Sequence, residues 1–304
     1  MTPLESTVSV IDPISPAIER VKTILFRPFD LGKWFVIGFC AWLAYLGKGG
    51  GGGGNGPNFR YDARSDHALE EAKHFVTENL AWIIPVAIFV MMLGIVLWLV
   101  ITWLSSRGQF MFLHCVAQNK AEVKNPWAKF KQHANSLFLF RIVLGLIGLV
   151  VIALPCILAI VLLVVTIARH GPHVLPIMGI VMLFLFIVCI SLVFFLIEKF
   201  TMDFVVPIMS LRTVSCITAW REFLAMLSTN KARFALYILF QIVIGICISA
   251  IILSAVCVTC CCACCILGIP YVGTVLLLPV FIFKRGYSLY YLRQFGPQFD
   301  VFMP

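Results

Sequence analysis

Long runs of uncharged, apolar residues alternate along this chain with short polar segments that carry most of the charge. A helix needs about 20 apolar residues to cross the roughly 30 Å hydrocarbon core of a bilayer. On that scale the pattern predicts an all-α polytopic protein, a single membrane domain over residues 1–304 with six transmembrane helices. These cover Leu31–Gly47, Leu80–Leu104, Leu137–Ile167, Val174–Ile197, Phe234–Val256 and about Ile266–Phe283.

The distribution of basic residues between these spans predicts the orientation in the membrane. Eighteen of the 23 Lys and Arg residues lie in the N-terminal segment, in the connections between spans two and three and between spans four and five, in the C-terminus and at the adjoining helix ends. The other five are Lys48, Arg60, Arg64, Lys73 and Arg169. Because cytoplasmic loops carry an excess of Lys and Arg, both termini are expected in the cytoplasm.

Composition supports the membrane assignment and narrows the partners. The chain is 61% hydrophobic and 12% charged, against about 45–50% and about 25% in soluble domains. The net charge of +9 sits in short clusters between apolar runs, a pattern that favours anionic lipid headgroups rather than nucleic acid. We therefore expect the lipid bilayer as partner, together with other membrane subunits or further copies of this chain.

A weak internal repeat suggests that one unit is used three times. Trp127–Phe130 matches Trp220–Phe223 at a shift of 93 residues, and Pro176–Gly179 matches Pro270–Gly273 at a shift of 94. The predicted unit is an amphipathic cytoplasmic helix followed by a transmembrane hairpin. Chance remains the alternative, because proline favours first helical turns and tryptophan favours membrane interfaces.

Three segments outside the spans have their own predicted character. The cytoplasmic segment 1–30 should hold the first amphipathic helix, Pro16–Phe29, with Ile18, Val21 and Leu25 on its apolar face. The non-cytoplasmic segment 48–79 begins with a glycine-rich linker and continues as an acidic helix. Residues 285–304 are expected to form a cytoplasmic tail.

A cysteine-rich segment at the turn between the last two spans is a candidate metal site. Thiolates at Cys-x-x-Cys spacing bind zinc, copper or an iron–sulfur cluster, or cycle as a disulfide. Packing of cysteine as a small apolar residue is the competing interpretation, and the sequence does not decide among the three. The candidate ligands are Cys257, Cys260, Cys261, Cys264 and Cys265.

Ionisable residues at the cytoplasmic edge of the spans form the second candidate site. A functional interpretation pairs Glu198 and Asp203 with Arg141 or Arg285 around a cavity; interfacial anchoring by salt bridges is the alternative. Arg107 belongs to the same edge. No catalytic triad, His-Glu-x-x-His motif or pair of catalytic carboxylates is present, so we expect neither an enzyme nor a cofactor.

Several segments resemble a known type of protein. Pro270–Pro279 and Arg285–Pro297, with Phe26–Phe29 and Gly32–Trp34 near the start, resemble a family of uncharacterised bacterial polytopic membrane proteins. That family is similar to the membrane domain attached to some glycerophosphoryl diester phosphodiesterases. The resemblance implies a six-helix protein of the bacterial inner membrane. It implies no catalytic residues, because the phosphodiesterase chemistry belongs to a separate soluble domain.

Three functions fit these observations. The leading hypothesis is a scaffold or accessory subunit that packs against other membrane components or lipids. The second is a transporter or channel-like protein for a small or lipidic molecule, with a cavity lined by Gln241, Glu198 and Asp203. The third is a metal- or redox-responsive membrane protein built on Cys257–Cys265.

Overall fold

The structure, a computed structural model, describes residues 8–47, 79–168, 174–259, 267–269 and 271–302, and these ranges are helical throughout apart from short connections. The predicted all-α class is confirmed for this part of the chain. The elements are α1 (Ile14–Leu25), α2 (Leu31–Tyr45), α4 (Leu80–Gln118), α5 (Lys124–Lys129), α6 (Lys131–Ala168), α7 (Val174–Phe200), a π-helical turn η1 (Thr201–Val205), α8 (Val206–Arg212), α9 (Cys216–Thr229), α10 (Lys231–Val258), α12 (Val272–Leu276), α13 (Leu278–Arg293) and the short η2 (Pro297–Phe299).

Four helical stretches among the described residues are long and apolar enough to cross a membrane. They are Ala81–Gln118, Lys131–Leu162, Val181–Arg212 and Lys231–Val258. These stretches are typical of a membrane-embedded protein and support that prediction. The first predicted span forms a shorter apolar helix of 15 residues, and the last is divided at Leu277 between α12 and α13, so the count of six stays a prediction.

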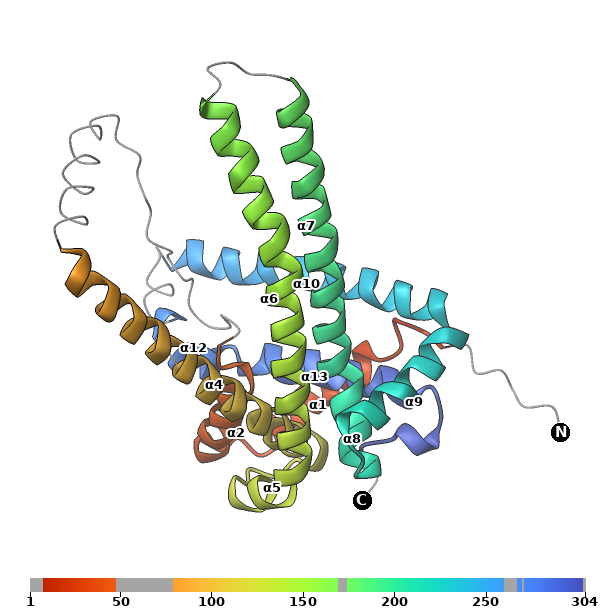
Figure 1. Cartoon of the computed structure of the whole chain (residues 1–304). Helices are drawn as coiled ribbons and strands as arrows, with labels where there is room; N and C mark the ends of the chain where they lie inside the picture. Colours follow the sequence, from red (N-terminus) through yellow and green to blue (C-terminus); the bar gives the residue numbers. More distant parts are fainter. Residues whose placement is uncertain (1–7, 48–78, 169–173, 260–266, 270, 303–304) are drawn as a thin grey trace.

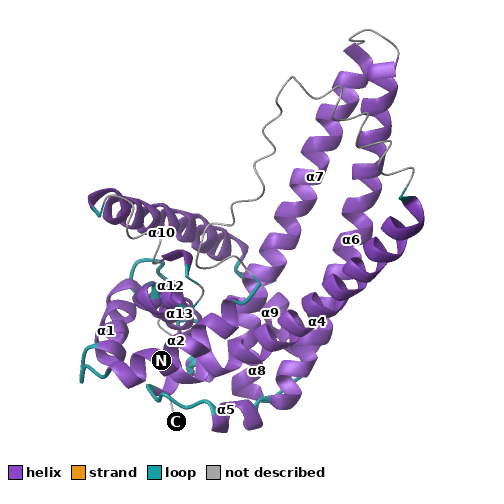
Figure 2. Ribbon diagram, turned by 90° about the vertical axis from the view of Figure 1, so that its left-hand side faces the viewer, coloured by secondary structure: helices purple, strands orange, loops and turns teal. Residues whose placement is uncertain are grey.

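The long helices extend from a common base (Figures 1 and 2). Helices α6 and α7 run side by side as an antiparallel hairpin, and α4 packs against the base-proximal part of α6. Helix α10 leaves the base in a different direction, at a steep angle to the α6–α7 hairpin in both views. Each of these helices therefore has one end in the base and a long free portion.

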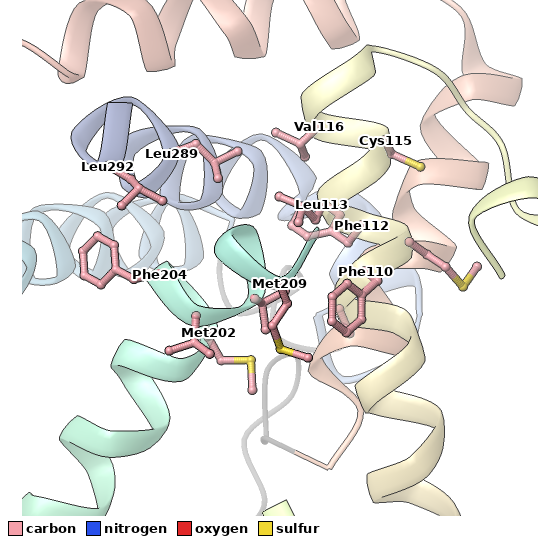
Figure 3. Close-up of a cluster of buried hydrophobic side chains, with 14 of the residues drawn as sticks. Phe110, Phe112, Leu113, Cys115, Val116, Met202, Phe204, Met209, Leu289 and Leu292 are labelled. Carbon is pink, nitrogen blue, oxygen red and sulfur yellow. The ribbon is translucent and has the colours of Figure 1, made fainter. Parts of the chain in front are cut away.

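The hydrophobic core lies in the base, which we define as α1, α2, the C-terminal half of α4, α5, Phe130, η1, α8, α9, α13 and the first turns of α6 and α10. Figure 3 shows buried side chains of α4, η1, α8 and α13 converging there. The largest fully buried side chains are Tyr237, Tyr287, Tyr291, Phe110, Phe112, Phe204, Phe223 and Phe234. Large apolar side chains on the free portions of α4, α6, α7 and α10 are exposed instead, and lipid can cover them without any helix partner.

Helix α4 continues 14 residues beyond the predicted end of its span at Leu104. The polar residues that suggested a boundary are accommodated inside the base. Ser105 Oγ and Gln109 Nε2 both donate hydrogen bonds to the carbonyl oxygen of Ala44, at 2.9 and 2.6 Å. Gly108 lies against the backbone of Leu43 and Ala44, where a β-carbon would collide. The close approach of α2 therefore supplies hydrogen-bond acceptors for Ser105 and Gln109, and this segment of α4 stays helical.

Helix α1 begins two residues before the predicted Pro16–Phe29 and ends four residues before its end. Of its predicted apolar face, Leu25 is buried and Val21 packs half-buried against the core, but Ile18 does not. Ala17, Ile24 and Leu25 are buried, whereas Ile18 is 43% exposed. The reason is that α1 packs on α13, where a β-carbon placed on Gly286 would lie 3.7 Å from the Ala17 β-carbon. Because the small Ala17 faces α13, the next residue, Ile18, points away from that contact.

The segment predicted as a C-terminal tail is part of the base. Residues 285–289 and 291–292 of α13 are buried. Two hydrogen bonds join Ser9 and Gln294, at 2.7 and 2.9 Å, and the Tyr287 hydroxyl donates to the Val10 carbonyl at 2.8 Å. The two ends of the described chain are thus bonded to each other.

The connections after α4 and α8 share a local geometry. Asn119 and Thr213, 94 positions apart, both adopt a left-handed conformation with φ of 57° and 53°. Phe130, directly after α5, stacks on a ring of α4, and Phe223 of α9 stacks on a ring of η1. The two stacked pairs are Phe110 with Phe130 at 5.6 Å and Phe204 with Phe223 at 5.3 Å between ring centroids.

Candidate functional site

The five predicted cytoplasmic-edge residues do not form one cluster. The structure pairs Arg141 with Glu198, places Asp203 near Arg285, and keeps Arg107 apart. Arg285 lies inside the base, and the other four lie where long helices enter it. The predicted alternatives of a cavity and of structural salt bridges therefore apply to different members of the set.

Arg141 on α6 is the centre of the first cluster. Its Nη1 donates to the hydroxyls of Ser105 and Ser106 on α4, both at 3.3 Å, and its Nη2 lies 3.6 Å from Glu198 Oε1 on α7. The Arg141 side chain is 9% exposed and that of Glu198 is 47% exposed. The buried Nε of Arg141 has no hydrogen-bond partner among the described residues, so the guanidinium keeps one unused donor.

Asp203 in η1 is the centre of the second cluster. Its Oδ2 accepts a hydrogen bond from the Tyr237 hydroxyl at 3.0 Å and lies 2.7 Å from Lys199 Nζ. Gln241 Nε2 donates in turn to the Tyr237 hydroxyl oxygen at 2.9 Å. The buried carboxylate is therefore paired and hydrogen-bonded, as a low-dielectric position requires.

Arg285 on α13 completes this second cluster. It is 4% exposed, its Nη1 donates to the Met202 carbonyl, and its charge is attracted by Asp203. These bonds connect α7, η1, α10 and α13. They hold helices together in the base, which is the anchoring interpretation for Asp203 and Arg285.

Arg107 has a third environment. Its guanidinium lies over the rings of Trp103 and Trp127, at 4.5 and 4.7 Å from their centroids. Cation–π contact of this kind stabilises a charge that is largely removed from water. Arg107 therefore joins α4 to α5.

A cavity of about 680 Å³ lies between α4, α6 and α7. Arg141, Glu198 and Ser105 line its end nearest the base, and its walls include Trp98, Leu144 and Phe194. The cavity is partly open to its surroundings. Of the three residues predicted to line a transport cavity, Glu198 lines this one, whereas Gln241 and Asp203 bond to Tyr237 in the second cluster.

The predicted metal site is largely beyond the described part of the chain. Cys257 at the end of α10 is a free, exposed thiol, and Cys260, Cys261, Cys264 and Cys265 lie outside the described residues, as does the outer segment 48–78. Within the described ranges, no three His, Cys, Asp or Glu side chains gather closely enough to hold a metal ion. The cysteine-based hypotheses stay predictions.

Two titratable groups in the base are held neutral by burial. Burial raises the pKa of the Cys216 thiol on α9 to about 12, although the charge of Arg141 opposes the shift. Burial likewise raises the pKa of Tyr291 on α13 to about 12. The Tyr291 hydroxyl donates to the Arg233 carbonyl at 2.9 Å, so it serves as a hydrogen-bond donor between helices.

Sequence reasoning singled out Gln241 but missed Tyr237, which lies between it and Asp203. A signal was available, because residues four apart share one face of a helix. It also missed Ser105 and Ser106 as partners of Arg141. Those contacts join positions 35 and 36 residues apart on different helices, and no local pattern reports them.

Comparison with known proteins places the chain in a family. Residues 8–281 match a family of unknown function, DUF7544, and the chain belongs to it. No curated protein and no solved structure matches. The expected membership of an uncharacterised family is confirmed, and the similarity to the membrane domain of glycerophosphoryl diester phosphodiesterases stays a prediction.

Proposed function

We propose that this member of a family of unknown function is a non-enzymatic, multi-pass membrane protein that acts as a scaffold or accessory subunit. Its long apolar helices contact lipids and other membrane components. One observation carries the proposal. Of the 28 residues of α10, the buried side chains are Phe234 and Tyr237, both near the base, and the rest of the helix offers an apolar surface to its surroundings.

Glycines on the free portions favour a helix as one of those surroundings. A β-carbon placed on Gly245 of α10 or on Gly94 of α4 would meet no atom of the described residues within 4 Å. Small residues on a membrane helix let another backbone approach closely. Gly245 therefore marks the surface where a helix of a partner subunit or of a second copy packs.

We further propose six membrane crossings with both termini in the cytoplasm of a bacterium. The bonds of Ser9 and Tyr287 across the two chain ends support an even number of crossings, because bonded segments lie on one side of the bilayer. The excess of Lys and Arg on that side supports its being cytoplasmic. The choice of the bacterial inner membrane rests on the family resemblance of the sequence.

The threefold repeat belongs to the same proposal. The matched left-handed residues and stacked phenylalanine pairs of α4–α5 and α8–α9 support two of its units. The packing of α1 on α13 supplies the third contact between a short base helix and the end of a long apolar segment. The N-terminal helix would then close a ring of three such contacts.

The test is purification from native membranes in nanodiscs, with mass spectrometry of the proteins that accompany the full chain. We expect a stoichiometric partner or a second copy. Gly245→Leu should remove that partner by blocking close helix approach, whereas the matched control Ile246→Leu, at a 64% exposed neighbour, should retain it. A lone monomer in the unsubstituted protein would overturn the accessory-subunit proposal.

A second candidate function, movement of a small or lipidic molecule, is favoured by the cavity between α4, α6 and α7. Its polar end and apolar walls fit an amphiphilic molecule. A liposome flux assay separates the two candidates, because a scaffold should leave transbilayer movement at the rate of protein-free liposomes. Flux that Ala153→Phe abolishes would favour transport, since Ala153 lines the cavity.

A further inference from the structure

We propose that the cavity between α4, α6 and α7 binds one zwitterionic phospholipid whose headgroup carries a primary amine. The phosphate lies against Arg141, the ammonium lies against Glu198, and an acyl chain follows the apolar walls. The inference rests on the membrane location in the proposed function and names the lipid that this site would select. It does not depend on a partner subunit.

The charges of the site fit a ligand with both signs. Arg141 and Glu198 line the same cavity at a mutual distance of 3.6 Å, which is longer than the roughly 2.7–2.9 Å of a strong charged hydrogen bond. Arg141 is nine-tenths buried and its Nε has no partner among the described residues. Its planar fork of donors matches a phosphate, and the carboxylate beside it matches an ammonium group.

The order of side chains along the cavity fits the length of an amphiphile. Arg141 and Glu198 lie at the end next to the base, and Ile152 on α6 lies 11 residues farther along the same helix. That separation is about 16 Å at the rise of an α-helix. A headgroup at Arg141 therefore leaves three helical turns of apolar wall for the upper part of an acyl chain.

Two glycines of α6 shape that wall. A β-carbon on Gly145 would lie 3.4 Å from Trp98 Cζ2, and one on Gly148 would lie 3.3 Å from Phe194 Cε1. Because neither glycine has a β-carbon, the Trp98 and Phe194 rings can both lie against the backbone of α6. The volume of about 680 Å³ is within the usual range of roughly 300–1,000 Å³ for ligand sites. Because the cavity is partly open, the remaining chain can extend into the bilayer.

The carboxylate of Glu198 decides between lipid classes. A purely anionic lipid would bring a second negative charge to Glu198 without compensation. A phosphocholine lipid carries a positive charge but has no N–H to donate to the carboxylate. A lipid with a primary amine both balances the charge and donates hydrogen bonds.

The test is native mass spectrometry of the full chain after exchange into nanodiscs of equal parts phosphatidylethanolamine, phosphatidylcholine and phosphatidylglycerol. We expect one retained lipid, with the ethanolamine lipid enriched about tenfold over the glycerol lipid. Equal retention of the three, preference for the glycerol lipid, or no retained lipid would overturn the proposal.

Variants separate the roles of the two charges. Arg141→Gln should lower lipid retention about tenfold, and Glu198→Gln should keep retention while removing the preference for the ethanolamine lipid. Arg212→Gln is the control, because Arg212 pairs with Glu222 in the base and does not line the cavity. Unchanged retention and preference in both cavity variants would contradict the assignment.

Ala153→Phe fills the apolar part of the cavity and leaves both charges in place, so it tests the site even where Arg141→Gln fails to fold. We expect loss of the retained lipid, and wild-type retention would overturn the proposal. The same spectra show whether a protein partner stays bound. Partner without lipid contradicts this inference alone, and lipid without partner contradicts the accessory-subunit proposal alone.

Discussion

The Tyr237 hydroxyl donates a hydrogen bond of 3.0 Å to Asp203 and so fastens the splayed helix α10 to the π-helical turn of the base. Tyr237 is fully buried. Its partner Asp203 lies within η1, where the π-helical turn is wider than an α-helical one. π-Helical turns often mark functional positions because they shift side chains out of the regular helical register. A polar contact inside an aromatic cluster thus helps to hold α10 against the base.

Tyr237→Phe should weaken this attachment without changing the packed ring. The substitution leaves a buried carboxylate oxygen with one partner fewer, at a cost of about 1–3 kcal/mol. Unfolding in mixed detergent micelles, followed by tryptophan fluorescence, measures the loss. Tyr290→Phe is the control, since the Tyr290 hydroxyl makes no hydrogen bond within the described part of the chain, and equal losses for both variants would contradict the assigned role.

Gly108→Ala should destabilise the crossing of α2 and α4. The added methyl group would meet the backbone of Leu43 and Ala44, which cannot move aside as a flexible side chain can, and overpacking of this kind costs about 1–3 kcal/mol. The methyl group of Gly94→Ala in the same helix would meet no described atom within 4 Å, so this substitution should be neutral or slightly stabilising. Matched unfolding curves that show no difference between the two would contradict this account.

Phe130→Ala and Phe223→Ala should each cost about 3–5 kcal/mol, because both rings are buried and stacked in the base. Phe89→Ala, at a ring that is 68% exposed on α4, should leave the unfolding midpoint in detergent nearly unchanged. If α5 and α9 are equivalent units of a repeat, the first two losses should also be similar. A large loss at one position and none at the other would argue against the repeat.

Cys216 should resist thiol reagents in the folded protein. The thiolate is the reactive form, and burial raises the pKa of Cys216 from 9.0 to about 12. The neutral thiol is therefore a stabilising contribution that is complete below about pH 9 and is lost as the pH rises toward 12. Peptide-resolved maleimide labelling at pH 8 should modify Cys216 in denaturing detergent and leave it intact in the native state; native labelling would contradict the prediction.

Apolar run length was sufficient to predict the existence and approximate extent of α6, α7 and α10, because a membrane span has few alternatives to a helix. It failed where protein rather than lipid surrounds the helix. Ser105 and Gln109 look like the end of a span, yet they continue α4 because Ala44 accepts their hydrogen bonds. That acceptor lies more than 60 positions away.

The candidate site shows the same division. The rarity of charge in apolar segments drew attention to Arg141, Glu198 and Asp203. It could not show that Arg141 and Glu198 line a cavity while Asp203 is enclosed by Tyr237 and Lys199. Distinguishing the two requires knowing which helices are neighbours, and nothing in a local pattern encodes that.

The bonds between Ser9 and Gln294 also set an order of events during synthesis. They join residues 285 positions apart, and ribosomes add about 5–20 residues per second, so the N-terminal helix waits roughly 15–60 s for its partner. Throughout that interval Ala17, Ile24 and Leu25 lack the surface that buries them in the finished protein. In a nascent or truncated chain that lacks α13, the apolar face of the N-terminal helix therefore stays exposed. Quality-control proteases and chaperones can recognise such an exposed apolar surface.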